Sequence, residues 1–172
     1  MKYEREREKK FVLSDITMAL AIMLLRDYAG LSNYSDLRGT STDTFWDQPG
    51  VDFVRLRKNT NELSIKITDK STIEDRVEEN ILVADYNTAF RFACATFGQP
   101  KGVVEKDYYV LDNFECTFSL YRVTGLDQLF LEIEAPTMSQ VNRAQKDLER
   151  IFHMKQEMRS LYQIVFGRKE AA

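Results

Sequence analysis

The feature that most constrains the fold is the alternation of charge in residues 3–13. Successive side chains of a β-strand point to opposite faces, so a period of two divides a strand into two sets. Here both sets are charged, with Glu4, Glu6, Glu8 and Lys10 on one face and Arg5, Arg7 and Lys9 on the other. An ordinary half-buried strand has an apolar residue at every second position. If this segment is a strand, it predicts one face in bulk water and the other in a wet, charged interior.

The acidic face has the chemistry of a cation and phosphate site. Carboxylates two residues apart on one strand face are separated by about 6.5–7 Å, close enough to share a hard divalent cation and its waters. Lys10, further along that face, can hold a phosphate as a point charge. The alternative is a plain solvated segment, because Glu, Arg and Lys also favour helix and runs of charge usually face water.

Composition limits the partners of the chain. Its 172 residues are 44% hydrophobic and 30% charged, which is typical of one globular domain with a sizeable core. The net charge of −3 provides no global basic field, so we expect no duplex nucleic acid, and an anion site must be a local cluster. Cys94 and Cys116 lack metal-ligand spacing and indicate a reducing, cytoplasmic location. Because the N-terminus is highly charged, we expect no signal peptide, and the apolar run 18–25 is too short to span a membrane.

Three helices are expected from capping residues and periodicity. The first covers residues 18–28, with Ser14 as its N-cap and Gly30 at its end. The second is capped by Asp85 or Asn87 and runs to residue 97. The third begins at Ser139 and continues to about residue 152. Residues 158–166 form a final short element.

The remaining segments predict strands with one polar and one apolar face. We expect them at residues 42–47, 52–58, 64–70, 75–83, 103–111, 114–123 and 129–134. Residues 31–49 are rich in Ser, Thr, Asn, Asp and Gly, so they predict a loop that enters a strand only near residue 42. Together with residues 3–13 this makes about eight short strands.

If these strands curl into an antiparallel barrel, their charged faces line one interior. That surface would collect Glu6, Glu8, Lys10, Arg55, Arg57, Lys66, Arg76, Glu78, Lys106, Glu132 and Glu134. The helices would cover the apolar faces outside. A small barrel fills its interior with side chains or holds one small ligand. Because buried charges without partners are costly, the ligand is expected to be polyanionic, with a metal that bridges it to the glutamates.

These residues resemble a known family. Glu6-Arg7-Glu8-Lys9-Lys10 is similar to the Glu-x-Glu-x-Lys opening signature of the CYTH domain, also called the triphosphate tunnel metalloenzyme superfamily. The family's later motifs have similar counterparts in the same order: Phe45-Trp46-Asp47, Arg55-Leu56-Arg57, Lys66, Arg76-Val77-Glu78, Lys106 and Glu132-Ile133-Glu134. Arg159-Ser160-Leu161-Tyr162 resembles the C-terminal Arg-Ser-Tyr segment of the class IV adenylyl cyclase branch. The resemblance covers residues 4–167.

The resemblance implies an α+β fold: an eight-stranded antiparallel β-barrel that forms a tunnel with flanking helices, built by residues 1–172 as a single domain. It implies Mg²⁺ or Mn²⁺ as the cofactor, with the metal ligands Glu6, Glu8, Glu132 and Glu134. The implied phosphate-binding residues are Lys10, Arg55, Arg57, Lys66, Arg76, Lys106 and Arg159. Glu78 and Lys66 are the implied catalytic residues, with Glu78 helping to hold metal or water.

Three functions agree with this resemblance. The first is a metal-dependent hydrolase of tripolyphosphate or of an organic or nucleoside triphosphate such as ATP. The second is a class IV-like adenylyl cyclase that makes cyclic AMP and pyrophosphate. The third is a module that binds a nucleotide or polyphosphate without turnover, and a homodimer is compatible with all three. Tyr108 replaces the arginine of the family's Lys-x-Arg strand, and Tyr121 stands where an acidic residue is usual; both departures favour a different substrate or a binding role.

Overall fold

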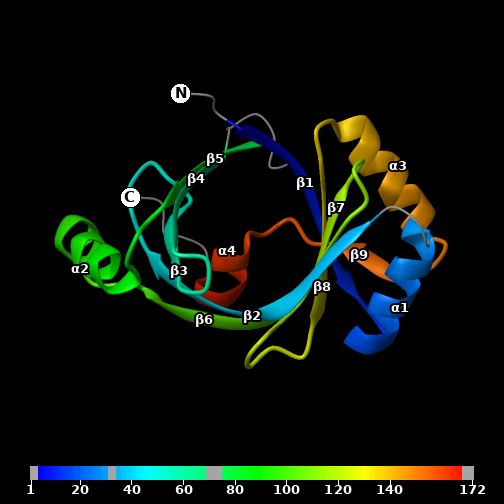
Figure 1. The fold of residues 1–172 in the computed structure, drawn as a ribbon, viewed down its shortest axis with the longest axis horizontal. Helices are drawn as coiled ribbons and strands as arrows, with labels where there is room; N and C mark the ends of the chain where they lie inside the picture. Colours follow the sequence, from blue (N-terminus) through cyan, green and yellow to red (C-terminus); the bar gives the residue numbers. More distant parts are fainter. Residues whose placement is uncertain (1–3, 31–33, 69–74, 168–172) are drawn as a thin grey trace. The chain divides into compact units, whose positions relative to one another are not determined.

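The structure, a computed structural model, describes residues 4–30, 34–68 and 75–167, apart from the side chains of residues 4–6, 68 and 75–77. The strands within these ranges are β1 (Glu4–Leu13), β2 (Ser35–Trp46), β3 (Phe53–Arg57), β4 (Glu62–Thr68), β5 (Asp75–Leu82), β6 (Gly102–Asp112), β7 (Thr117–Val123), β8 (Leu129–Ala135) and β9 (Met154–Gln156). The helices are α1 (Met18–Ala29), α2 (Tyr86–Phe97), α3 (Met138–Leu148) and α4 (Leu161–Phe166). Figure 1 shows these elements along the chain.

The strands form one antiparallel sheet in the order β5-β4-β3-β2-β6-β7-β8-β1-β9, and β5 also pairs with β1. The predicted fold class, α+β with an antiparallel sheet and flanking helices, is confirmed. The described part of the sheet has nine strands rather than eight, because the short β9 adds to β1, and it is not strictly closed. None of the described helices combines the length and apolar composition that crossing a membrane requires.

The chain divides into two compact units. The first unit comprises Met1–Arg5, Ser41–Glu105 and Met158–Ala172. The second unit comprises Glu6–Thr40 and Lys106–Glu157. Each unit has its own hydrophobic core, described below.

In the first unit, the end of β2 and strands β3, β4 and β5 pair antiparallel, and α2 covers one face. Alternation along β3 explains the two faces, since Val54 and Leu56 are buried in the core while Arg55 and Arg57 point the other way. The core also holds Trp46, which is fully buried, and Ala93 of α2. The apolar face is therefore covered by a helix, as the sequence predicts.

The short helix α4 lies in the same unit, against aromatic residues of the opposite sheet face. Ser160 caps α4 with a full capping box, in which its hydroxyl accepts from the backbone of Gln163. Tyr162 stacks on Phe53, with ring centroids 6.2 Å apart, and meets Phe45 edge-on at 5.9 Å. Burial raises the pKa of Tyr162 to about 12. These contacts hold α4 beside the charged part of that face.

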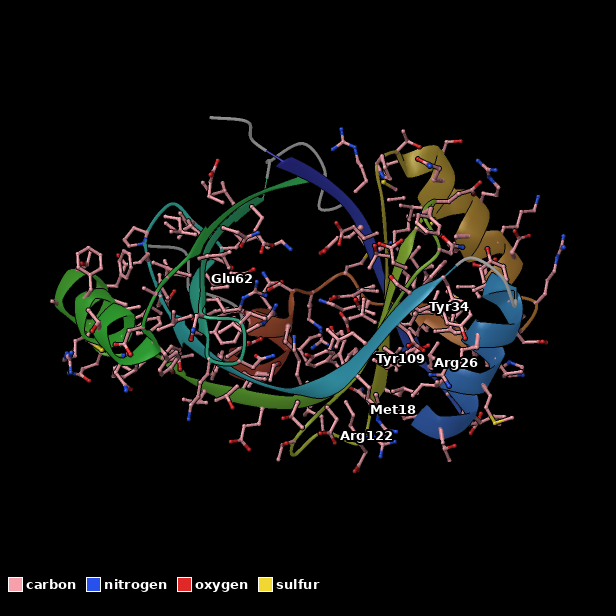
Figure 2. The ribbon with its side chains drawn as sticks, viewed as in Figure 1. Met18, Arg26, Tyr34, Glu62, Tyr109 and Arg122 are labelled. Atoms are coloured by element: carbon pink, nitrogen blue, oxygen red, sulfur yellow. The ribbon has the colours of Figure 1, made fainter. Side chains whose placement is uncertain are left out.

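In the second unit, β6, β7, β8 and β1 share one apolar face that α1 and α3 cover. Its core contains Phe11, Leu120 and Leu131 from the strands, with Leu25 from α1 and Leu148 from α3. Arg26 of α1 also approaches the sheet, where it donates to the hydroxyl of Tyr109 in β6 over 3.1 Å (both labelled in Figure 2). The covered apolar face again agrees with the expected pattern.

Several predicted boundaries are wrong, for local reasons. The N-cap of α1 is Thr17, which accepts from Leu20, and not Ser14, since Asp15 has a left-handed φ of 58° that a helix excludes. The N-cap of α3 is Thr137 rather than Ser139, and α3 ends at Leu148. Segment 31–49, predicted as a loop that enters a strand only near residue 42, contains all of β2, which begins at Ser35, because strand pairing overrides its turn-rich composition. Its first residues, 31–33, and the expected strand end at residues 69–70 lie outside the described residues.

Candidate functional site

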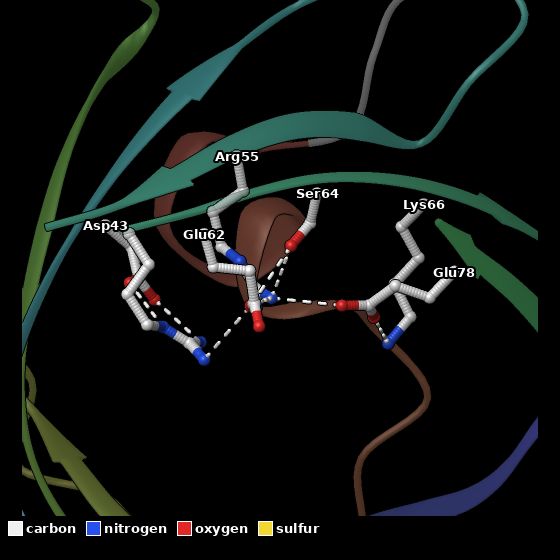
Figure 3. A network of polar contacts seen from close by, with 7 residues as sticks. Asp43, Arg55, Glu62, Ser64, Lys66 and Glu78 are labelled. Atoms are coloured by element: carbon white, nitrogen blue, oxygen red, sulfur yellow. Dashed lines mark hydrogen bonds and ion pairs between the residues drawn. The ribbon is translucent and has the colours of Figure 1, made fainter. Parts of the chain in front are cut away.

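The charged face of the first unit carries a network of polar side chains, shown in Figure 3. We call it the ion-pair cluster: Asp43, Arg55, Arg57, Glu62, Ser64, Lys66 and Glu78. Strand register explains why these residues meet, since directly opposite residues of an antiparallel pair share a face with Cβ atoms about 4.5–5.5 Å apart. The opposite pairs are Asp43 with Arg57, Arg57 with Glu62, Arg55 with Ser64, and Lys66 with Glu78.

Arg57 is held by a buried carboxylate. Its Nε donates to Asp43 Oδ1 over 2.9 Å and its Nη2 donates to Asp43 Oδ2 over 3.3 Å, a two-point contact, while Asp43 is fully buried. Its Nη1 lies 3.7 Å from Glu62 Oε1. Burial lowers the pKa of Arg57, but the charge and hydrogen bonds of Asp43, together with the charges of Glu62 and Glu78, outweigh it, so the net pKa is raised. Arg57 is therefore a permanently charged, fixed cation.

Arg55 uses one nitrogen for three contacts. Its Nη2 donates to Ser64 Oγ and Glu78 Oε1, both over 3.0 Å, and to Glu62 Oε1 over 3.2 Å. Its Nε is buried and has no hydrogen-bond partner among the described residues. A buried donor that lacks an acceptor costs about 1–3 kcal/mol. Arg55 thus presents an unsatisfied donor that an added oxygen ligand would satisfy.

Lys66 completes the cluster. Its Nζ lies 3.0 Å from Glu78 Oε2, and both side chains are more than nine-tenths buried. Glu78 therefore bridges two of the predicted phosphate-binding residues, because its other oxygen accepts from Arg55. The cluster holds three cations and three carboxylates, so its formal charge is zero.

The charged face of the second unit carries the glutamates. Lys10 in β1 lies opposite Glu132 in β8, and its Nζ is 3.2 Å from Glu132 Oε1. The hydroxyl of Tyr121 donates to the same oxygen over 2.9 Å. Lys106 lies over the Tyr121 ring, 5.1 Å from its centroid. Tyr121 also stacks on Phe130, with centroids 5.2 Å apart, so its ring is firmly placed.

Glu8 and Glu134 lie opposite each other in the pairing of β1 with β8. Glu8 is buried, whereas Glu134 is exposed. A search of the described residues finds no group of three or more His, Cys, Asp or Glu side chains arranged to hold a metal. The carboxylates on these two strands are hard oxygen donors, the type that Mg²⁺ and Mn²⁺ prefer. The donor set of this face therefore fits such an ion in chemistry.

The predicted site residues have different outcomes. Within the first unit the structure brings together Arg55, Arg57, Lys66 and Glu78. Within the second unit it joins Lys10 to Glu132 and places Lys106 on Tyr121. The predicted site also includes Glu6 in β1 and Arg76 in β5, whose side chains lie outside those described.

Arg159 is exposed, just before the cap of α4. Its neighbours in the motif have structural roles, since Ser160 caps the helix and Tyr162 is buried against aromatic rings. Two residues of the Arg-Ser-Tyr segment, Ser160 and Tyr162, therefore have roles in the local fold.

Sequence reasoning missed Asp43 and Glu62 as members of the cluster. The sequence could have indicated them. Glu62 alternates with Ser64 and Lys66 and so shares their strand face, and Asp43 lies two residues before Phe45 and so shares its face. It also left Tyr108 without an explanation. A Cβ on Gly39 would lie 2.9 Å from the Tyr108 hydroxyl oxygen, so the glycine in β2 leaves room for this tyrosine in the neighbouring β6.

The chain resembles known proteins in its structure but has no match by sequence. No protein-family model matches the chain, and a search of curated proteins finds no match. The PH1012 protein of Pyrococcus horikoshii OT3 is similar over 90% of this chain and 96% of its own, with a TM-score of 0.70 and 22% identity. A proposed adenylate cyclase of Vibrio parahaemolyticus is similar over 95% of this chain and 99% of its own, with a TM-score of 0.68 and 15% identity.

A third solved structure is that of HpAC1 from Hippeastrum, a proposed adenylyl cyclase described as having a dominant triphosphatase activity. It is similar over 94% of both chains, with a TM-score of 0.63 and 13% identity. Identities this low establish a shared fold and leave the activity to be argued from the residues. The chain has the fold of CYTH-type proteins, that is, the triphosphate tunnel metalloenzyme fold.

Proposed function

We propose that this protein is a metal-dependent hydrolase of a triphosphate, either tripolyphosphate or an organic or nucleoside triphosphate. The observation that carries the proposal is the ion-pair cluster, in which Arg55, Arg57 and Lys66 gather on one sheet face. The buried Nε of Arg55, which lacks an acceptor among the described residues, supports an oxygen-rich ligand there. Guanidinium groups match phosphate oxygens in shape and charge.

The protein's own residues would contribute mainly by positioning the phosphate chain and by neutralising its charge, which are the two requirements of phosphoryl transfer. Asp43 fixes the orientation of Arg57 through its two-point contact. Glu78 holds Arg55 and Lys66 at a set spacing, since one of its oxygens contacts each. Under this proposal Glu78 and Lys66 are the catalytic residues, and a phosphate chain would lie along the three cations.

The remaining residues keep the roles that the family resemblance implies. The phosphate-binding set extends to Lys10, Arg76, Lys106 and Arg159, and the metal ligands are Glu6, Glu8, Glu132 and Glu134. We propose Mg²⁺ or Mn²⁺, and residues 1–172 as one working domain. When bound, such an ion neutralises phosphate charge and makes a water molecule a better nucleophile.

The second candidate function is adenylyl cyclisation. The Vibrio neighbour, which is named as a proposed adenylate cyclase, favours it. The HpAC1 neighbour bears a cyclase name but a dominant triphosphatase activity, which supports hydrolysis on this fold. The Arg159–Tyr162 motif also favours cyclisation, although Ser160 and Tyr162 have structural roles as well, in capping α4 and in aromatic packing. The third candidate, binding without turnover, is favoured by Tyr121 in place of an acidic residue.

A product assay separates the three functions. The purified protein is incubated with tripolyphosphate and with ATP, in Mg²⁺, in Mn²⁺ or with a chelator, and orthophosphate, pyrophosphate and cyclic AMP are resolved. We expect orthophosphate that depends on the metal. Cyclic AMP with pyrophosphate would instead establish the cyclase. Thermal stabilisation by either ligand without any product would establish the binding module, since ligand at 100 times its Kd adds about 2.7 kcal/mol.

A further inference from the structure

The cations of the ion-pair cluster already have carboxylate partners. Arg55 and Arg57 contact Glu62, Glu78 and Asp43 in the combinations given above. With Lys66, which contacts Glu78, the three cations and three carboxylates have formal charges that sum to zero. A phosphate chain that binds to these arginines must therefore compete with carboxylates. The three carboxylates differ in how easily they can be displaced.

Asp43 and Glu78 are poor candidates for displacement. Asp43 is fully buried and makes two hydrogen bonds to Arg57. Glu78 has only 6% of its side chain exposed and contacts two cations. Moving either one would leave a buried charge without its partner, which is strongly destabilising.

Glu62 differs from both. Its side chain is 21% exposed, the highest value among the three carboxylates. A single oxygen, Oε1, lies 3.2 Å from Arg55 Nη2 and 3.7 Å from Arg57 Nη1, and the Ser64 hydroxyl donates to it over 3.3 Å. One anionic oxygen that contacts two guanidinium groups and a hydroxyl has the surroundings of a bound phosphate oxygen. Glu62 is the first residue of β4, and its partly exposed side chain already reaches solvent.

We propose that Glu62 is an internal counterion of the phosphate site, which occupies a phosphate-oxygen position between Arg55 and Arg57 until a ligand displaces it. The inference rests on the proposed function, since it names how that site selects its ligand. The carboxylate keeps the two arginines paired and ordered in the absence of ligand. It also sets a threshold, because only an anion that offsets the loss of two arginine contacts can replace it.

The test is the affinity for sodium tripolyphosphate without metal, measured by isothermal titration calorimetry. Glu62→Gln keeps the size of the side chain and one acceptor oxygen but removes its charge. We expect this variant to bind tripolyphosphate roughly tenfold more tightly than the wild type. The reason is that it lacks the negative charge that repels the ligand and competes with it for Arg55 and Arg57. The control is Glu115→Gln, which changes the net charge equally at an exposed glutamate paired with Arg143. We expect no change in its Kd.

The outcomes are distinguishable. If wild type and Glu62→Gln bind with the same Kd, or the variant binds more weakly, the counterion role is wrong even if the protein hydrolyses triphosphates. If the variant binds more tightly but neither protein releases orthophosphate with metal, the counterion role holds and the hydrolase is wrong. If neither protein binds tripolyphosphate without metal, the counterion role is wrong, and orthophosphate release in the presence of metal decides the hydrolase separately. Glu62→Ala provides a second variant without charge, and tighter binding there supports the same conclusion.

Discussion

Glu132 is oriented by two neighbours at one of its oxygens. Lys10 Nζ and the Tyr121 hydroxyl both contact Oε1, at 3.2 Å and 2.9 Å. Tyr121 is itself fixed by stacking on Phe130, so the hydrogen bond has a defined direction. We therefore propose that Tyr121 positions Glu132, a proposed metal ligand, in the way that hydrogen bonds to metal ligands do in known metal sites.

Tyr121→Phe tests this role at the scale of one atom. The variant retains the ring, its stacking and its contact with Lys106, but loses the hydroxyl that donates to Glu132. Mutation of a residue that hydrogen-bonds to a metal ligand typically lowers metal affinity 10–100-fold. We therefore expect the metal concentration that gives half-maximal activity to rise roughly tenfold. The measurement is activity against Mn²⁺ concentration, with thermal unfolding as the check on folding. An unchanged metal requirement would show that the hydroxyl is only structural.

At the scale of elements, polar contacts tie α1 to two strands. Arg26 of α1 and Tyr109 of β6 both donate to Asp36 Oδ2 in β2, over 3.0 Å from Arg26 Nε and 2.8 Å from the hydroxyl. Burial, the largest cause, and the hydrogen bond to Asp36 raise the pKa of Tyr109 while Arg26 lowers it, and together they raise it from its ordinary 10.0 to about 12. The hydrogen bond from Tyr109 to Asp36, which helps to connect β6 with β2, therefore requires that the tyrosine keep its proton.

The raised pKa of Tyr109 makes stability depend on pH in a known direction. Because the folded pKa exceeds the unfolded value, the contribution is fully present below pH 10 and is lost as pH rises towards 12. We expect the free energy of unfolding of Tyr109→Phe to fall less steeply across this range than that of the wild type. At pH 7 the variant is less stable by about 1 kcal/mol, the net value of one hydrogen bond. Urea unfolding at several pH values measures both, and parallel pH curves would contradict the assignment.

At the scale of the whole molecule, the division of each strand into a charged and an apolar face was predictable from the sequence. Alternation along the chain identified Arg55, Arg57, Lys66 and Glu78 as residues of one surface, and the first unit brings them together. The charged segment at the N-terminus is a strand, as the two-faced interpretation required. The alternation of side chains along a strand depends only on neighbouring residues, so it can be recognised in a single sequence without the structure.

Contacts that depend on register could not be read from the sequence. Asp43 lies within the predicted strand 42–47, but its role depends on which residue of β3 lies opposite it. The hydrogen bond from Tyr121 to Glu132 likewise depends on the pairing of β7 with β8. The short β9 was missed because its three residues are ordered by pairing with β1 rather than by their own pattern.

The measurement that tests the central claim most directly is orthophosphate release from tripolyphosphate by the wild type and by the double variant Glu6→Gln plus Glu8→Gln. Both carboxylates lie on β1, and both are proposed metal ligands. The account predicts release that requires Mg²⁺ or Mn²⁺ in the wild type and falls at least about 100-fold in the double variant, because the metal supplies several kcal/mol of charge stabilisation. Equal release by the two proteins, or release that persists in chelator, would contradict it.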